Sequence, residues 1–202
     1  MPNSINEASG LAASIVNENA YWTHNDSGDE PRVFLINEKA EILATVAFEG
    51  ISNRDWEEIV VGPGPDVDKS YLYIGEIGDN SARYETKVIY RIEEPTVAPS
   101  AEEQALFNNS EIAKIEFVYP DGKRDAEALL IDQNTKDLYI ITKREPNVNV
   151  YVMKYPQFTD RVNVLTKLGS IPFHKVVAAD LLNGKEILLK TYENVYYWQM
   201  LE

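Results

Sequence analysis

Short apolar segments recur along the chain, and each is bounded by Gly, Pro, Asn or Asp. Within them, β-branched and aromatic residues predominate, which is typical of β-strands joined by turns. We therefore predict a chain built almost entirely of strands. The clearest segments are residues 71–74 (YLYI), 87–92 (KVIYRI), 138–142 (LYIIT) and 194–198 (NVYYW).

One segment has a helical pattern instead. Residues 100–107 (SAEEQALF) follow Pro95 and Pro99, and Ser100 with Glu103 forms a capping box. We predict a short helix here, in a loop between two repeats.

The predicted strands are ordered as a repeat, which begins with an acidic motif. The pattern R-D-x-E-x-[IL]-[VL] occurs at 54–60 and 124–130, with weaker relatives at 7–12 and 178–182. Two further strands follow each copy, and a fourth strand follows in the first three repeats. The second strands are predicted at 20–24, 71–75, 138–142 and 186–190, the third at 32–36, 88–92, 148–153 and 195–198, and the fourth at 41–48, 112–119 and 162–169.

Four antiparallel strands in each of about four repeats predict an all-β fold of the β-propeller class. A β-sandwich is the alternative, but it does not explain the recurring acidic motif. We predict a single domain over residues 1–202, with approximate blades at 5–50, 51–120, 121–170 and 171–202. The fourth repeat stops after its third strand, at Trp198. The ring is thus expected to be small, incomplete or closed by another chain, and an open strand edge favours a homo-oligomer.

Composition narrows the classes of function. The chain has 33 acidic and 19 basic residues, a net charge of −14, so we expect no binding to nucleic acid. It lacks cysteine, which excludes disulfides, thiolate metal sites and cysteine nucleophiles. No apolar run reaches the roughly 18 residues of a membrane span. The polar start of the chain has no signal-like region, so the protein is either cytoplasmic or has lost a signal peptide.

Several motifs together resemble a family of bacterial six-bladed β-propeller proteins of uncertain function. More distantly, the chain is similar to SdiA-regulated and phytase-like propellers. Members of the family are usually exported, so the resemblance favours an extracytoplasmic location, and they continue through further blades beyond the equivalent of Trp198. The motifs are at 7–11 (EASGL), 22–28 (WTHNDSG), 53–57 (NRDWE), 75–80 (GEIGDN), 125–129 (DAEAL), 142–144 (TKR), 178–180 (AAD) and 190–192 (KTY).

The acidic motif suggests a metal site, because the first strand of each propeller blade lines a central channel. Carboxylates that converge there repel one another, and Ca²⁺ with its six to eight oxygen ligands relieves that repulsion. The candidate metal ligands are Glu7, Asp55, Glu57, Asp125, Glu127 and Asp180, which we expect at equivalent positions. Further candidate ligand-binding residues lie at turns or strand ends: Asp26, Asp79, Asn80, Lys143 and Lys190.

A structural role is the alternative for these acids, which can accept backbone hydrogen bonds or pair with Arg54 and Arg124. Of the two histidines, His24 and His174, the first is interpreted as a structural residue. The three tryptophans are interpreted as packing residues, with the wall of a pocket as the alternative for Trp56.

Three functions remain open from the sequence. The first is a non-catalytic propeller that binds a small ligand or a protein partner and holds Ca²⁺. The second is a Ca²⁺-dependent hydrolase of phosphoesters or lactones, suggested by the similarity to phytase-like propellers. The third is an assembly module completed by another copy.

Overall fold

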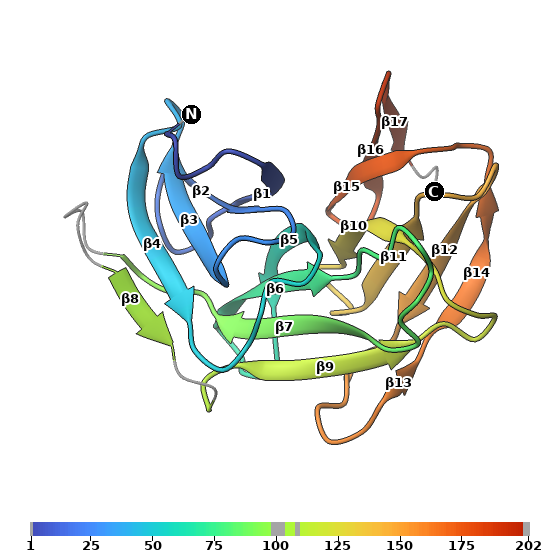
Figure 1. Cartoon of the computed structure of the whole chain (residues 1–202), viewed down its shortest axis with the longest axis horizontal. Helices are drawn as coiled ribbons and strands as arrows, with labels where there is room; N and C mark the ends of the chain where they lie inside the picture. Colours follow the sequence, from blue (N-terminus) through green and yellow to red (C-terminus); the bar gives the residue numbers. More distant parts are fainter. Residues whose placement is uncertain (1, 98–103, 108–109, 200–202) are drawn as a thin grey trace. The chain divides into compact units, whose positions relative to one another are not determined.

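The computed structural model describes residues 2–97, 104–107 and 110–199, and these residues form strands and turns without a helix. The strands build four sheets (Figure 1), which confirms the predicted all-β propeller class. The chain divides into two compact units. One contains residues 1–76 and 90–114, and the other contains residues 77–89 and 115–202.

The first sheet lies in the first unit and has the order β1-β2-β3-β4-β8. Strands β1 to β4 are antiparallel neighbours, and β8 joins the outer edge of β4 in parallel. Ile5, Phe34 and Ile36 form a buried cluster against this sheet. The strands are β1 (Ala8–Ala13), β2 (Ala20–Asn25), β3 (Arg32–Asn37), β4 (Ile42–Phe48) and β8 (Gln104–Phe107).

The second sheet has the order β13-β9-β7-β6-β5, and the division between the units falls within β7 and β9. Strand β5 pairs with β6 in antiparallel fashion, whereas β13 adds to β9 in parallel. Its strands are β5 (Trp56–Pro63), β6 (Ser70–Glu76), β7 (Lys87–Glu93), β9 (Ala113–Val118) and β13 (Asn163–Val164).

The third and fourth sheets lie in the second unit and pack face to face. Their orders are β10-β11-β12-β14 and β15-β16-β17, both antiparallel. A buried apolar cluster joins them, with Leu130 and Ile141 from the third sheet against Val176 and Leu189 from the fourth. The strands are β10 (Ala126–Ile131), β11 (Leu138–Thr142), β12 (Val148–Met153), β14 (Thr166–Ile171), β15 (Val176–Leu182), β16 (Glu186–Thr191) and β17 (Val195–Gln199).

The prediction of a helix at 100–107 is wrong for residues 104–107. Residues 100–103 lie outside the described part of the chain. Residues 104–107 are strand β8, which pairs with residues 45–48 of β4. The outer edge of β4 presents unpaired backbone groups, and pairing with them satisfies both strands. A helix of two turns in isolation is marginal in water, so the sheet edge prevails over the local preference.

The strand predicted at 162–169 is divided in two. Residues Asn163–Val164 pair with β9, and residues Thr166–Ile171 pair with β12. Leu165 between them is buried, and its N–H donates to the carbonyl of Val118. The chain thus moves from one sheet to the next at this residue.

No helix of the described part is long and apolar enough to cross a membrane.

Candidate metal site

The first strand of every sheet has a register shift at the same place. The pairing skips one residue in β1, β5, β10 and β15, and the extra residues are Gly10, Glu57, Glu127 and Val177. A β-bulge of this kind leaves one residue out of the ladder, bends the strand and re-aims the side chain. The acidic motif therefore places its glutamate on the bulge and its aspartate two residues earlier.

This register corrects the expected equivalence of the six carboxylates. Counted from the bulge, Glu7 corresponds to Arg54 and Arg124, not to the acids that follow them. Asp180 lies three residues past its bulge residue, on β15 opposite Leu188, and corresponds to Leu130 of the third sheet. Glu7 and Asp180 are both exposed. Their predicted equivalence with the other acids is wrong.

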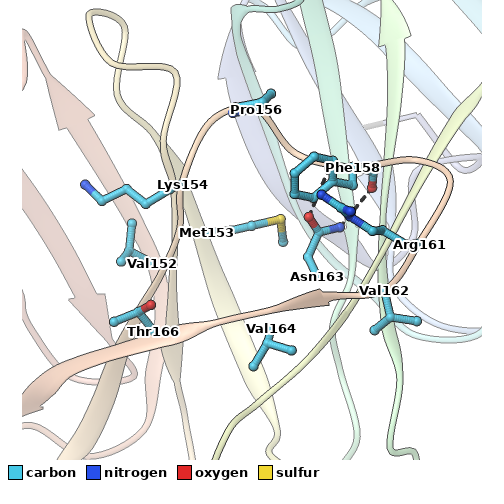
Figure 2. A pocket seen from close by; sticks show the side chains of 10 residues that line it. All are labelled: Val152, Met153, Lys154, Pro156, Phe158, Arg161, Val162, Asn163, Val164 and Thr166. Carbon is cyan, nitrogen blue, oxygen red and sulfur yellow. Dashed lines mark hydrogen bonds between the residues drawn. The ribbon is translucent and has the colours of Figure 1, made fainter.

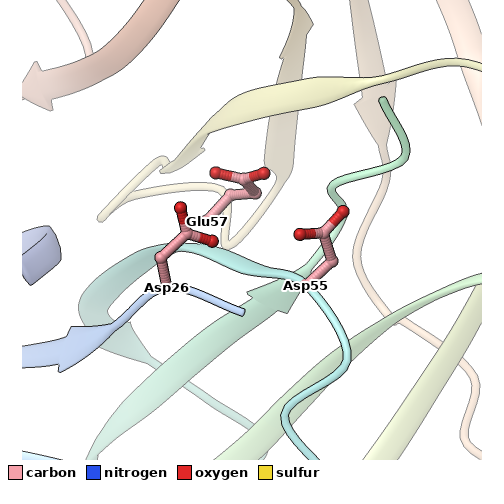
Figure 3. Close-up of side chains that lie close together, drawn as sticks. All are labelled: Asp26, Asp55 and Glu57. Atoms are coloured by element: carbon pink, nitrogen blue, oxygen red, sulfur yellow. The ribbon is translucent and has the colours of Figure 1, made fainter. Parts of the chain in front are cut away.

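In the first unit, three carboxylates lie close together (Figure 3). Asp26 follows β2, Asp55 precedes β5, and Glu57 occupies the bulge of β5. One oxygen from each lies within 4.8 Å of the others, and Glu57 is buried while the two aspartates are half-buried. Asp26 was expected as a ligand-binding residue at a turn, and the structure places it with the two acids of the first R-D-x-E motif.

Asn53 holds the two segments of this cluster together. Its Nδ2 donates to the carbonyl oxygens of Asn25 and Asp26 at 3.1 and 2.8 Å, and its Oδ1 accepts the N–H of Trp56 at 3.2 Å. Asp26 is held from the other side, because its N–H donates to the carbonyl of Glu7 at 2.9 Å. Glu7 thus contributes its backbone to the site. No role was predicted for Asn53 from the sequence, since Asn25 and Asp26 lie 28 and 27 residues away along the chain.

His24 is a neutral, buried residue next to the segment that carries Asp26. It is 0% exposed, and its ring meets that of Trp56 edge-on, with centroids 5.8 Å apart. Burial lowers the pKa of His24 to about 4, although the hydrogen bond to the Asn25 carbonyl and the charge of Asp26 act in the opposite direction. The structural role predicted for His24 fits this environment. At neutral pH, His24 supplies no positive charge to offset Asp26.

The three acids match the donor set of a hard divalent cation. Each carboxylate offers two oxygens, and Ca²⁺ accepts six to eight oxygen ligands in flexible geometry. Like charges this close together disfavour one another, and a bound cation relieves the repulsion. The arrangement can therefore hold Ca²⁺ through Asp26, Asp55 and Glu57.

The second R-D-x-E motif, in the other unit, is neutralised by basic side chains. Asp125 accepts the N–H of Asp79 at 2.7 Å and the Nε–H of Arg144 at 2.5 Å. Glu127 forms an ion pair with the buried ammonium of Lys143. By register, Lys143 and Arg144 correspond to the uncharged Ile77 and Gly78 that follow β6. The alternative of a structural role therefore describes Asp125 and Glu127 best.

Asp79 is also committed to a structural network. Its carboxylate pairs with Lys87 at 2.6 Å, both side chains are buried, and it accepts the N–H groups of Arg83 and Tyr84 at 2.8 Å. Burial alone would raise the pKa of Asp79, but Lys87 and the two N–H groups lower it. Asn80 and Lys190 are exposed, and their part in ligand binding stays a prediction.

A small cavity of about 220 Å³ lies beside β12, β13 and β14 (Figure 2). Met153, Phe158 and Val164 contribute to its lining, and the Arg161 guanidinium lies 3.5 Å from the centre of the Phe158 ring. Ligand pockets usually enclose about 300–1,000 Å³. The cavity is smaller than that, and none of the predicted site residues line it.

Comparisons with known proteins support the fold. No family model matches the chain, and neither does any curated protein. Among solved structures, a chain of a yeast heterotrimeric nucleoporin complex is similar at a TM-score of 0.54 and 9% identity, over 100% of this chain and 63% of that chain. Hydrazine synthase of Kuenenia stuttgartiensis is similar at a TM-score of 0.49 and 11% identity, over 94% of this chain and 58% of that chain.

The present chain thus spans less than two thirds of the length of either structure. At such low identity, the likeness to the nucleoporin-complex chain concerns the propeller fold alone.

Proposed function

We propose that this protein is a non-catalytic β-propeller that binds a ligand or a protein partner, and that it holds one Ca²⁺ between Asp26, Asp55 and Glu57. The observation that carries the proposal is the approach of three carboxylate oxygens to within 4.8 Å of one another. The cation joins the end of β2 to the start of β5 and stabilises the first unit.

The resemblance to exported propeller proteins supports an extracytoplasmic location, and a modest calcium affinity suits it. Extracellular calcium modules have dissociation constants of roughly 10⁻⁴ to 10⁻³ M. A site of three carboxylates with half-buried aspartates belongs to this range. In this proposal the cation stabilises the fold, and the ligand or partner binds elsewhere on the propeller.

Thermal unfolding with a chelator, and then with Ca²⁺ restored, tests the proposal. Binding to the native state alone stabilises it by about 2.7 kcal/mol at a hundredfold excess of Ca²⁺ over the dissociation constant. With about 2–4 °C per kcal/mol for a domain of this size, Tm should rise by roughly 5–10 °C. The variant Asp55→Asn keeps the shape of the side chain and removes the charge, so its Tm should not respond to Ca²⁺.

Asp180→Asn is the matched control, because Asp180 is an exposed acid of a weaker motif copy. It should respond to Ca²⁺ as the wild type does. A wild-type Tm that ignores Ca²⁺ would remove the proposal, and so would equal responses of Asp55→Asn and wild type. Turnover of phosphate esters or lactones by the Ca²⁺-loaded protein would favour the hydrolase instead; we expect none.

A further inference from the structure

The two faces of the fourth sheet differ sharply in exposure. One face packs on the third sheet, where Ala128, Leu130 and Ile141 cover it and are buried. The opposite face carries Leu182 of β15, Leu188 of β16, and Val195 and Tyr197 of β17, which are 57%, 47%, 65% and 57% exposed. Apolar side chains gathered on one sheet face mark an interaction surface.

The strand register shows what this outer face corresponds to. Both sheets are aligned at their bulges, so Ala178 and Asp180 of β15 take the positions of Ala128 and Leu130 of β10. On the next strand, Lys190 takes the position of Ile141. The outer face of the fourth sheet is thus the counterpart of the face that the third sheet buries against its neighbour.

The outer face of the fourth sheet differs from its buried counterpart on the third sheet in charge. Leu130 and Ile141 are buried and apolar, whereas Asp180 and Lys190 at the same positions are exposed. No ion pair joins Asp180 or Lys190 to another residue of the described chain. Asp180 lies opposite Leu188, and Ala178 lies opposite Lys190, so the two charged residues are diagonal neighbours on the same face. The face therefore carries two acids, Asp180 and Glu186, and one base, Lys190, among apolar side chains. Glu186 accepts a hydrogen bond from the Tyr197 hydroxyl, so Asp180 and Lys190 are the two charged groups left for an interface.

We infer that this face docks on the same face of a second copy of the chain, around a two-fold axis. An interface of two identical faces must be self-complementary. A two-fold axis between the faces, perpendicular to the line from Asp180 to Lys190, brings each Asp180 opposite the Lys190 of the other copy. Leu182, Leu188, Val195 and Tyr197 then supply the apolar contact. A face of three short strands gives a small interface, and the dimer is weak and reversible.

Charge exchange tests this dimer without removing any apolar contact. The experiment is sedimentation equilibrium from micromolar to millimolar concentration on the wild type, Asp180→Lys, Lys190→Asp and the double variant. Each single variant places like charges opposite each other and should weaken dimerisation at least tenfold. The double variant restores the opposite pairs and should dimerise as the wild type does.

Mixing the two single variants sharpens the test. Each should be monomeric alone, whereas the mixture should form a heterodimer, because both charge pairs are then complementary. This result also shows that both variants fold. A monomeric wild type at every concentration would overturn the inference. A dimer whose strength ignores these charges would also overturn it, since that outcome indicates association elsewhere, for example at the open edge of β17.

Discussion

Asp55 and Asp125 occupy the same position of the acidic motif, two residues before the bulge, and their surroundings differ. Asp125 has a guanidinium and a backbone N–H as partners. Asp55 lies with Asp26 and Glu57, and all three are acids. The residues that follow the second strand of each sheet differ. They are Lys143 and Arg144 in the third sheet, and Ile77 and Gly78 in the second. A motif alone thus does not determine whether a carboxylate lies beside a basic side chain or among other acids.

His24 leads to a prediction about pH. Its folded pKa is about 4, against about 6.5 when unfolded, so above pH 6.5 it is neutral in both states and its contribution to stability is full. As the pH falls from 6.5 towards 4, His24 binds a proton in the unfolded chain but not in the folded state, and the free energy of unfolding therefore decreases. The expected loss is about 3 kcal/mol, from 1.36 kcal/mol per pKa unit.

Urea unfolding at pH 7 and pH 4 measures this loss. His24→Gln should flatten the pH dependence relative to the wild type, and His174→Gln, at an exposed position, should leave it unchanged. Equal slopes for wild type and His24→Gln would contradict the buried, neutral state of His24.

Among single residues, the sequence identifies those with a local pattern and misses those with distant partners. Asp26, Asp55 and Glu57 belong to motifs and were predicted as site residues. Glu94 has no motif, yet it is buried and accepts hydrogen bonds from Trp22 Nε1 at 2.9 Å and Ser14 Oγ at 2.6 Å. These donors lie some 70 to 80 residues away in the sequence, so no local pattern predicts the hydrogen bonds.

At the scale of strands, the bulge of β1 depends on a close backbone approach. Gly10 has φ +68°, and a Cβ built there would lie 2.7 Å from the N of Ile59 and 2.8 Å from Glu58 Oε1. Strands β1 and β5 therefore pack at a distance that only glycine permits.

We predict that Gly10→Ala lowers the free energy of unfolding by more than the 1–3 kcal/mol typical of a strained backbone position. Gly28→Ala is the control, because Gly28 has φ +87° and open space around it, so only the backbone strain applies. Chemical denaturation compares the two. Equal losses would show that β1 and β5 tolerate a side chain between them.

Strand positions follow from local alternation, and strand register does not. The second strands of all four sheets lie where the alternation predicts them. The bulges were not visible in the sequence, and for this reason Glu7 and Asp180 were aligned with the wrong residues. Strand β8 was not predictable for a similar reason. Its local sequence favours a helix, and pairing with the edge of β4 makes it a strand.

For the whole molecule, the order of strands and the repeated motif were sufficient to predict the propeller class. The parallel additions of β8 to β4 and of β13 to β9 were not predictable, because they connect segments distant in sequence. The net charge of −14 has a consequence at this scale. A surplus of negative charge opposes the compact state, so binding of cations favours folding.

Calorimetric titration with Ca²⁺ tests the central claim most directly, that the first acidic motif holds the cation and the second does not. The wild type should bind one Ca²⁺ per chain, and Asp55→Asn should lose this binding. Asp125→Asn should be less stable, since it weakens a buried charged hydrogen bond worth about 1.5–3 kcal/mol, yet should bind Ca²⁺ with unchanged stoichiometry. Binding lost in a folded Asp125→Asn protein and retained in Asp55→Asn would contradict the assignment.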